Sequence, residues 1–348
     1  MQIIRQRAFA RTGLMGNPSD GYFGRTISVL VRDFYATVIL YEWENIELIP
    51  SREDNSRFDS VDQLVRDVRL HGYYGGIRLV KATIRKFVEF CTQQTERGEL
   101  GYGLHDRNFS VRYETNIPRQ VGLAGSSAIV VATLRALMEF YEIEIPQRVQ
   151  PSLVLAVENG ELGISGGLQD RVIQVYGGLV YMDFGRDVME RVCGFDCGVY
   201  EPLDLSLLPR LYIAYATDIS EPTEALHNPL RASYDRGVQE VVDAMDDFAS
   251  YTTEAREALK CGDTHRFGEL IDANFDRRAS ICRLHDGHVD MIKAARSVGA
   301  SAKYAGSGGA IVGTCKDEET YEQLRRKLEA LTSIRCQVFQ PTVTPPGV

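Results

Sequence analysis

Two glycines and two serines stand directly before a long apolar run. In the stretch "NIPRQVGLAGSSAIVVATLRAL" (residues 116–137), an extended polar segment passes through "GLAGSS" into a run that is apolar on nearly every side. The start of a helix exposes backbone N–H groups and the positive end of its dipole, so it attracts anions. Glycines let a ligand approach the backbone closely, and serines can cap the helix or offer hydroxyls to a metal. The pattern predicts either a phosphate-binding turn or an ordinary capped helix.

Three other segments contain the residue types that phosphoryl transfer needs. The segment "RAFARTGLMGNPSDGYFG" has Arg11 and Asp20 on either side of a Gly-Asn-Pro turn. In "ENGELGISGGLQDRVIQVYGG", acidic residues precede a glycine-rich turn that ends in Asp170, and "KYAGSGGAIV" is a second glycine-rich loop that enters a strand. Together with the first stretch, they offer a phosphate-binding backbone, a metal carboxylate, a base and a cation.

Other nucleotide and metal signatures can be excluded from the sequence. There is no Gly-Lys dipeptide and therefore no Walker A loop, and neither Gly-x-Gly pair continues into a dinucleotide fingerprint. The tripeptide Asp-Phe-Gly at residues 183–185 lacks the His-Arg-Asp motif of protein kinases. The pairs His285/His288 and Cys193/Cys197 have no matching second pair, so we expect them to serve packing or loop structure.

Length and composition limit the classes of function. A chain of 348 residues suits two domains that share a cleft, and 44% hydrophobic with 25% charged residues is typical of a soluble globular protein. The net charge of −9 argues against a nucleic-acid surface, although a local arginine can still bind a small anion. No apolar run approaches the ~18–20 residues of a membrane helix. Without a signal peptide, and with seven scattered cysteines, the chain is predicted to be cytoplasmic.

Hydrophobic periodicity predicts alternating strands and helices followed by a second, helix-rich half. In the first half we expect strands over residues 27–40 and 109–113, and helices over 61–70, 77–90 and 129–141. In the second half we expect a strand over 211–216, helices between 230 and 284, a helix over 288–298, a strand at "GAIVGTC", a helix over 320–331 and a strand over 335–339. That ending predicts a second α+β domain, with a boundary near Leu205.

These segments, which are spread over residues 7–312, resemble the motifs of the GHMP kinases, the superfamily of galactokinase, homoserine kinase and mevalonate kinase. The family's three motifs occur in this chain in the family's order. The resemblance implies an α+β fold of two domains. Residues 1–205 would form an ATP-binding domain like ribosomal protein S5 domain 2, and residues 206–348 a ferredoxin-like domain. Within the superfamily, "RAFARTGLMGNPSDGYFGRTIS", "GYYGGIRL" and "GLQDRVIQVYGGLVYMDF" are similar to the glucuronokinase branch.

The resemblance implies a reaction. A glucuronokinase-like enzyme transfers phosphate from ATP, with Mg²⁺, directly to the anomeric hydroxyl of D-glucuronate, a step in carbohydrate metabolism toward UDP-glucuronate. ATP and D-glucuronate are then the expected partners, without nucleic acid or membrane. The alternatives are another sugar kinase of this fold, acting on a heptose, fucose, arabinose or galacturonate, and a sensor that binds sugar and ATP without catalysis. The presence of Asp170 and Glu158 argues against a sensor.

The family's phosphate loop reads Pro-x-x-x-Gly-Leu-Gly-Ser-Ser-Ala, and this chain has one extra residue, Gly-Leu-Ala-Gly-Ser-Ser-Ala. By resemblance, this loop and the second glycine-rich loop hold the nucleotide. The implied nucleotide-binding residues are Pro118, Gly122, Leu123, Ala124, Gly125, Ser126, Ser127, Ala128, Gly306, Ser307 and Gly308.

The resemblance also implies the roles of four residues around the sugar. Asp170 matches the aspartate that takes the proton from the substrate hydroxyl, and Arg11 matches the basic residue beside that hydroxyl. Asp20 corresponds to the aspartate that binds sugar hydroxyls in galactokinase. Asn17 stands where galactokinase has a glutamate, so the contacts with the sugar must differ.

Mg²⁺ would be bound by Ser127 and a glutamate. Family spacing puts that glutamate eleven residues before Asp170, but Asn159 occupies the position, between Glu158 and Glu161. One inserted residue in "ENGELG" explains the shift and makes Glu158 the expected ligand, with Glu161 as the alternative.

The carboxylate of glucuronate needs a partner of opposite charge. An arginine is favoured, because its planar guanidinium matches a carboxylate bidentately. Arg25, which follows the sugar-binding turn, and Arg277 and Arg278, in "NFDRRASICRL", are the three candidates.

Overall fold

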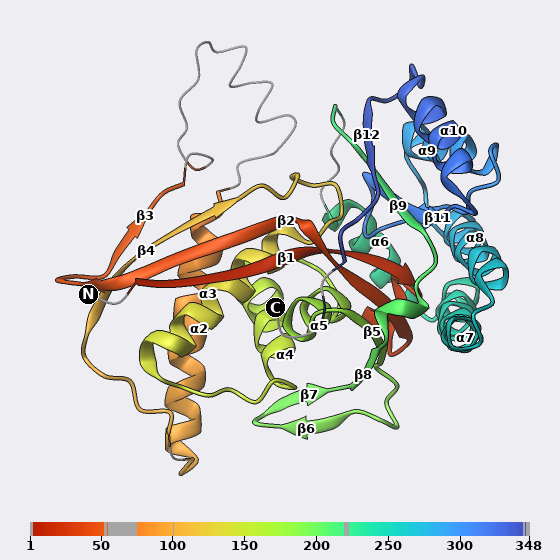
Figure 1. Cartoon of the computed structure of the whole chain (residues 1–348). Helices are drawn as coiled ribbons and strands as arrows, with labels where there is room; N and C mark the ends of the chain where they lie inside the picture. The colour runs from red at the N-terminus through yellow and green to blue at the C-terminus, as the bar shows by residue number, and fades with distance from the viewer. Residues whose placement is uncertain are drawn as a thin grey trace.

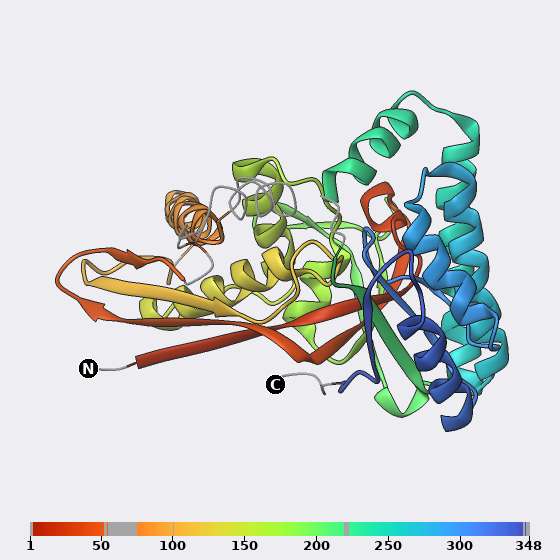
Figure 2. The same ribbon diagram turned by 90° about the horizontal axis from the view of Figure 1, so that it is seen from above.

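The computed structural model describes residues 3–51, 54, 75–99, 101–218, 223–343 and 345 (Figures 1 and 2). It has a larger N-terminal half built on a six-stranded sheet and a smaller C-terminal half built on a four-stranded sheet. The helix predicted over residues 61–70 lies outside the described residues.

The long strand β2 organises the first sheet. The strands of this half are β1 (Ile3–Met15), β2 (Arg25–Trp43), β3 (Glu47–Ile49), β4 (Asn108–Thr115), β5 (Leu179–Asp183) and β8 (Val199–Leu203), with a separate hairpin of β6 (Glu190–Val192) and β7 (Phe195–Cys197). One edge of β2 pairs with β1, and the other pairs first with β5 and then with β4. The β-branched and aromatic side chains of β2 suit this half-buried position. The strand predicted over 27–40 is therefore confirmed and is longer than expected.

Helices cover one face of this sheet (Figure 2). They are α2 (Ile77–Glu96), α3 (Gly125–Tyr141), α4 (Gln150–Leu155) and α5 (Gln169–Tyr176). Helix α3 packs against β1 and β2, and residues on all of its sides are buried, which confirms the prediction from its apolar sequence. The predicted helix over 77–90 and the predicted strand over 109–113 correspond to α2 and β4.

The second half has the expected mixture of strands and helices. Its elements are β9 (Leu211–Ala216), α6 (Thr223–Asp235), α7 (Gln239–Cys261), α8 (Thr264–Ile281), α9 (Asp286–Arg296), β10 (Lys303–Tyr304), β11 (Ala310–Thr314), α10 (Glu318–Glu329) and β12 (Cys336–Phe339). The strands are antiparallel in the order β10-β11-β9-β12. Leu205 falls between β8, in the first sheet, and β9, in the second. The domain boundary itself stays a prediction.

The two halves share one continuous core. Buried residues of β9 and α8, including Ile213 and Phe267, belong to the same apolar cluster as Leu14 of β1. Backbone contacts also join them, since the N–H of Gly13 donates to the carbonyl of Ala305 at 2.8 Å. The loops at this junction are therefore held in a defined position relative to each other.

None of the helices described is long and apolar enough to cross a membrane. All seven cysteines lie in the described part of the chain, and none of them forms a disulfide there.

Candidate active site

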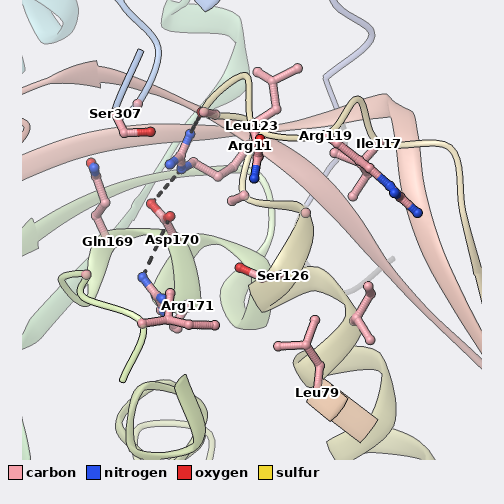
Figure 3. A pocket seen from close by; sticks show the side chains of 18 of the residues that line it. Arg11, Leu79, Ile117, Arg119, Leu123, Ser126, Gln169, Asp170, Arg171 and Ser307 are labelled. Carbon is pink, nitrogen blue, oxygen red and sulfur yellow. Dashed lines mark hydrogen bonds and ion pairs between the residues drawn. The ribbon is translucent and has the colours of Figure 1, made fainter. Parts of the chain in front are cut away.

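A cavity of ≈ 220 Å³ lies at the junction of the two halves (Figure 3). Its wall comes from the turn after β1, the start of α2, the loop before α3, the turn before α5, and the loop between β10 and β11. One end is mainly apolar, with Leu79, Ile117 and Ile129, while the other carries charged groups, among them Arg11 and Asp170. The cavity therefore offers two chemically different regions within a single space.

The start of α3 is open to a ligand. Ala124 has a left-handed backbone (φ 62°), and among the described residues no side chain caps the helix. The serines form other bonds: Ser126 Oγ donates to Glu158 Oε1 at 2.7 Å, and Ser127 Oγ donates to the carbonyl of Ala124 at 3.2 Å. The alternative of an ordinary helix capped by a serine is therefore not what the structure shows. The first turn instead presents backbone N–H groups at the cavity wall, as anion binding requires.

The two glycine-rich loops touch directly. A Cβ on Gly122 would lie 2.7 Å from the carbonyl oxygen of Gly308, and one on Gly306 would lie 2.3 Å from the carbonyl oxygen of Gly122. Side chains at these positions would push the loops apart.

Most of the predicted nucleotide-binding residues line the cavity. These are Pro118, Gly122, Leu123, Ala124, Gly125, Ser126, Gly306 and Ser307. Ser127, Ala128 and Gly308 are not in its wall. Ser127 and Ala128 face the core of the first half, where they are buried, and Gly308 packs on Gly122. Their contribution to nucleotide binding stays a prediction.

Arg11 links the predicted base to both loops. Its side chain is buried, and Nε donates to Asp170 Oδ1 at 2.6 Å (Figure 3). Nη1 donates to the carbonyl of Gly122 at 2.6 Å and to that of Ala305 at 3.2 Å. Asp170 stands in the first turn of α5 and lines the cavity. The structure thus brings together the two residues that were predicted to act on the hydroxyl.

Asp20 is buried beside this pair. Its Oδ2 accepts the backbone N–H of Gln169 at 3.1 Å, and a Cβ on Gly167 would lie only 2.0 Å from the same oxygen. Burial, and after it the nearby charge of Asp170, raises the pKa of Asp20 from 3.8 to about 6. The hydrogen bond from Gln169 opposes this rise.

Asn17 lines the cavity but also connects the halves. Its amide donates to the carbonyls of Tyr304 and Gly306, both at 3.4 Å, and its Oδ1 accepts a hydrogen bond from Lys303. Lys303 is buried, and reasoning from the sequence missed it, because lysine is usually a surface residue.

Glu158 lies on a π-helical segment, Ala156–Glu161. A π-helical turn accommodates one residue more than an α-helical turn, which is the physical form of the insertion inferred from "ENGELG". Oε2 of Glu158 accepts from Arg171 Nε at 2.8 Å, and Oε1 accepts from Ser126. Glu161 instead points toward α2, where it pairs with Arg85 at 2.5 Å. The structure thus puts Glu158, and not Glu161, beside the phosphate loop.

The serine next to Glu158 is Ser126, whereas Ser127 was predicted as the metal ligand. Successive residues of a helix point about 100° apart, so only one of the two adjacent serines can face the glutamate. Within the described residues no group of three or more His, Cys, Asp or Glu side chains could hold a metal. Mg²⁺ often binds through one or two protein oxygens together with substrate phosphates, and Glu158 Oε1 with Ser126 Oγ fits that donor set.

Two of the three candidate arginines lie away from the cavity. Arg25 Nε is paired with Asp183 at 2.6 Å and Arg277 Nε with Asp247 at 2.6 Å, and neither lines the wall. Arg278 is in the wall and is 2% exposed.

The chain is similar to known proteins over most of its length. Residues 78–178 match the family described as GHMP kinases N terminal domain, and residues 255–332 match GHMP kinases C terminal. Glucuronokinase 1 of Arabidopsis thaliana is 42% identical to the chain over 321 residues, which cover 90% of this chain and 85% of that protein. The chain belongs to the GHMP kinase family.

Solved GHMP kinases share the fold at lower identity. The mevalonate kinase of Methanococcus jannaschii superposes with a TM-score of 0.67 at 18% identity, and the match covers 98% of each chain. The galactokinase of Lactococcus lactis, crystallised with galactose, gives a TM-score of 0.69 at 14% identity and covers 98% of this chain and 94% of that one. The two-domain α+β fold expected from the sequence is therefore confirmed.

Proposed function

We propose that this GHMP kinase transfers the terminal phosphoryl group of ATP to the anomeric hydroxyl of D-glucuronate, in the cytoplasm. The identity of 42% to a glucuronokinase over 90% of the chain supports the substrate. The observation that carries the chemistry is the contact of 2.6 Å between Arg11 and Asp170, in the wall of a cavity that also contains the uncapped start of α3.

The two ends of the cavity suit the two substrates. The apolar side chains around Leu79, Ile117 and Ile129 favour the base of the nucleotide, because flat apolar groups gain most from burial there. Its phosphates would lie against the backbone N–H groups at the start of α3. The charged end, with Asp20 and Asp170, would then receive the sugar hydroxyls.

In this proposal Asp170 accepts the proton of the anomeric hydroxyl while that oxygen attacks the terminal phosphorus in line with the leaving group. Arg11 fixes the direction of the carboxylate through Nε, and its positive charge lies where negative charge develops during transfer. Glu158 and Ser126 would hold Mg²⁺, which neutralises charge on the phosphate oxygens when it is bound. The direct contact between the two glycine-rich loops would help to keep water, which could otherwise accept the phosphoryl group, away from the phosphates.

A kinase assay over uronic acids and neutral sugars tests the proposal. We expect ADP release with D-glucuronate, and a product that no longer behaves as a reducing sugar, because phosphate at the anomeric carbon blocks ring opening. If heptose, fucose, arabinose or galacturonate is used instead of glucuronate, the substrate assignment is wrong. If the product still reduces, the phosphate is on another hydroxyl.

A further inference from the structure

Two buried cations at the junction of the halves have no acidic partner among the described residues, and one of them, Arg278, lines the charged end of the cavity. Arg278 Nη1 donates to the carbonyl of Gly306 and Nη2 to that of Ser307, both at 2.7 Å. A guanidinium has five N–H groups, and Nε of Arg278 has no hydrogen-bond partner in the part of the chain that is described. In the described part of the chain its charge therefore meets carbonyl groups and the ring of Tyr304, whose centre lies 5.0 Å from Cζ, and no carboxylate.

Lys303 is the second of these cations. Nζ donates to the carbonyls of Gly13 at 2.7 Å and Tyr304 at 2.8 Å, and also to Oδ1 of Asn17. These three acceptors use all three N–H groups of an ammonium. Burial lowers the pKa of Lys303 well below its ordinary value, and the charges of Arg278 and Arg11 lower it further. A bound anion would relieve this repulsion.

Arg278 is held next to the catalytic pair. Arg11 donates to the carbonyl of Ala305, and Arg278 donates to the carbonyls of the next two residues of the same loop. A Cβ on Gly306 would lie 2.9 Å from Arg11 Nη2, so the absence of a side chain lets Arg11 pack against this peptide. The guanidinium groups of Arg11 and Arg278 therefore contact adjacent peptide units.

The structure of a uronic acid suits the adjacent positions of Arg11 and Arg278. In the pyranose ring, the anomeric carbon and the carbon that bears the carboxylate are both bonded to the ring oxygen. If the anomeric hydroxyl contacts Asp170 and Arg11, the carboxylate lies at the same edge of the ring, next to the ring oxygen. It would then face the neighbouring part of the wall, where Arg278 lies.

The other arginines in the wall are less suited to this carboxylate. Arg11 is committed to Asp170, and Arg171 is paired with Glu158. Arg119 lies beside Ile117, away from Asp170 in Figure 3, and Arg78 adjoins Leu79 at the same apolar end.

We propose that Arg278 binds the carboxylate of the substrate and that this contact selects a uronic acid over a neutral sugar. The inference rests on the proposed function and assigns the specificity of that same site. Of the three arginines predicted from the sequence, Arg25, Arg277 and Arg278, only Arg278 lines the cavity.

The test compares D-glucuronate with D-glucuronamide, which has nearly the same shape and no charge. In the wild-type enzyme we expect kcat/KM for glucuronate to exceed that for glucuronamide by about tenfold or more. Arg278→Gln should lower kcat/KM for glucuronate by roughly 30-fold or more, since it leaves a buried carboxylate unpaired. The value for glucuronamide should change by less than about threefold, and KM for ATP should be unchanged. Arg277→Gln removes the neighbouring, partly buried ion pair with Asp247 and is the matched control. It should leave kcat/KM unchanged for both glucuronate and glucuronamide.

The competing explanation is that Arg278 only supports the loop at Gly306. An equal loss with both substrates in Arg278→Gln would establish that role and overturn the proposal. Arg278→Lys keeps the charge and covers the case in which the glutamine variant does not fold: it should still lose more activity with glucuronate than with glucuronamide. Equal wild-type use of the two substrates would also overturn the proposal, whereas no phosphorylation of any uronate would contradict the proposed function itself.

Discussion

Asp20 allows a quantitative prediction about stability and pH. Its carboxyl group is buried, and burial, followed by the charge of Asp170, raises its pKa from 3.8 to about 6. A group whose pKa is higher in the folded than in the unfolded state stabilises the fold fully below the unfolded pKa, and this contribution is lost as the pH rises through the folded pKa. The free energy of unfolding therefore loses the contribution of Asp20 between about pH 4 and pH 6.

The size of the effect follows from the pKa. At ~1.4 kcal/mol for each pKa unit, a rise from 3.8 to about 6 corresponds to about 3 kcal/mol. Asp20→Asn removes the ionisation but keeps an oxygen that can accept the N–H of Gln169. Relative to the wild type, the variant should therefore gain about 3 kcal/mol of stability as the pH rises from about 4 to above 7.

Urea unfolding of both proteins across this pH range measures the difference directly. Taking the difference cancels the titration of the carboxylates that do not interact with Asp20. Asp246→Asn, at an exposed position of α7, controls for the loss of one negative charge and should show a difference that does not vary with pH. If the Asp20→Asn difference is also independent of pH, or becomes less favourable as the pH rises, then Arg171, Arg11 and the hydrogen bond from Gln169 outweigh burial and the reasoning is wrong.

Three further predictions concern activity and packing. Asp170→Asn keeps the side-chain shape but removes the base, so turnover should fall by roughly 10²–10⁴ while ATP and glucuronate still bind; near-normal turnover of a folded variant would remove the assignment. Glu158→Gln should raise the Mg²⁺ concentration needed for half-maximal activity, and Glu161→Gln, whose carboxylate pairs with α2, should not; the opposite result would move the metal ligand by three residues. Gly306→Ala puts a Cβ 2.3 Å from a backbone oxygen of the phosphate loop, so it should cost about 1–3 kcal/mol in thermal unfolding and lower kcat/KM. Gly103→Ala, which meets no heavy atom within 4 Å, should do neither.

Local pattern was sufficient for the motifs and for many of the elements, although β1, α4 and α5 were not among the elements expected. The strand over residues 211–216 has the bounds of β9, and helix α3 is buried as its apolar sequence indicates. Hydrophobic periodicity and glycine-rich turns are both set by residues that are close in sequence. Both can therefore be recognised without knowledge of tertiary contacts. The resemblance of the motifs also identified Arg11 and Asp170, which the fold brings to 2.6 Å from each other across 159 residues of sequence.

Tertiary structure decided which of several equivalent side chains reaches the site. Two adjacent serines differ in sequence by one position, but that step rotates a side chain by about 100° around the helix, so that Ser126 contacts Glu158 and Ser127 turns back to Ala124.

The same holds for the arginines and for the buried lysine. Arg277 and Arg278 are neighbours in sequence, yet one pairs with Asp247 on α7 and the other is enclosed at the cavity. Lys303 is buried because carbonyls of β1 and β10, together with Asn17, converge on its ammonium group. Such convergence depends on contacts between segments nearly 300 residues apart. The sequence records which groups are available, whereas packing alone determines which of them leave water and meet.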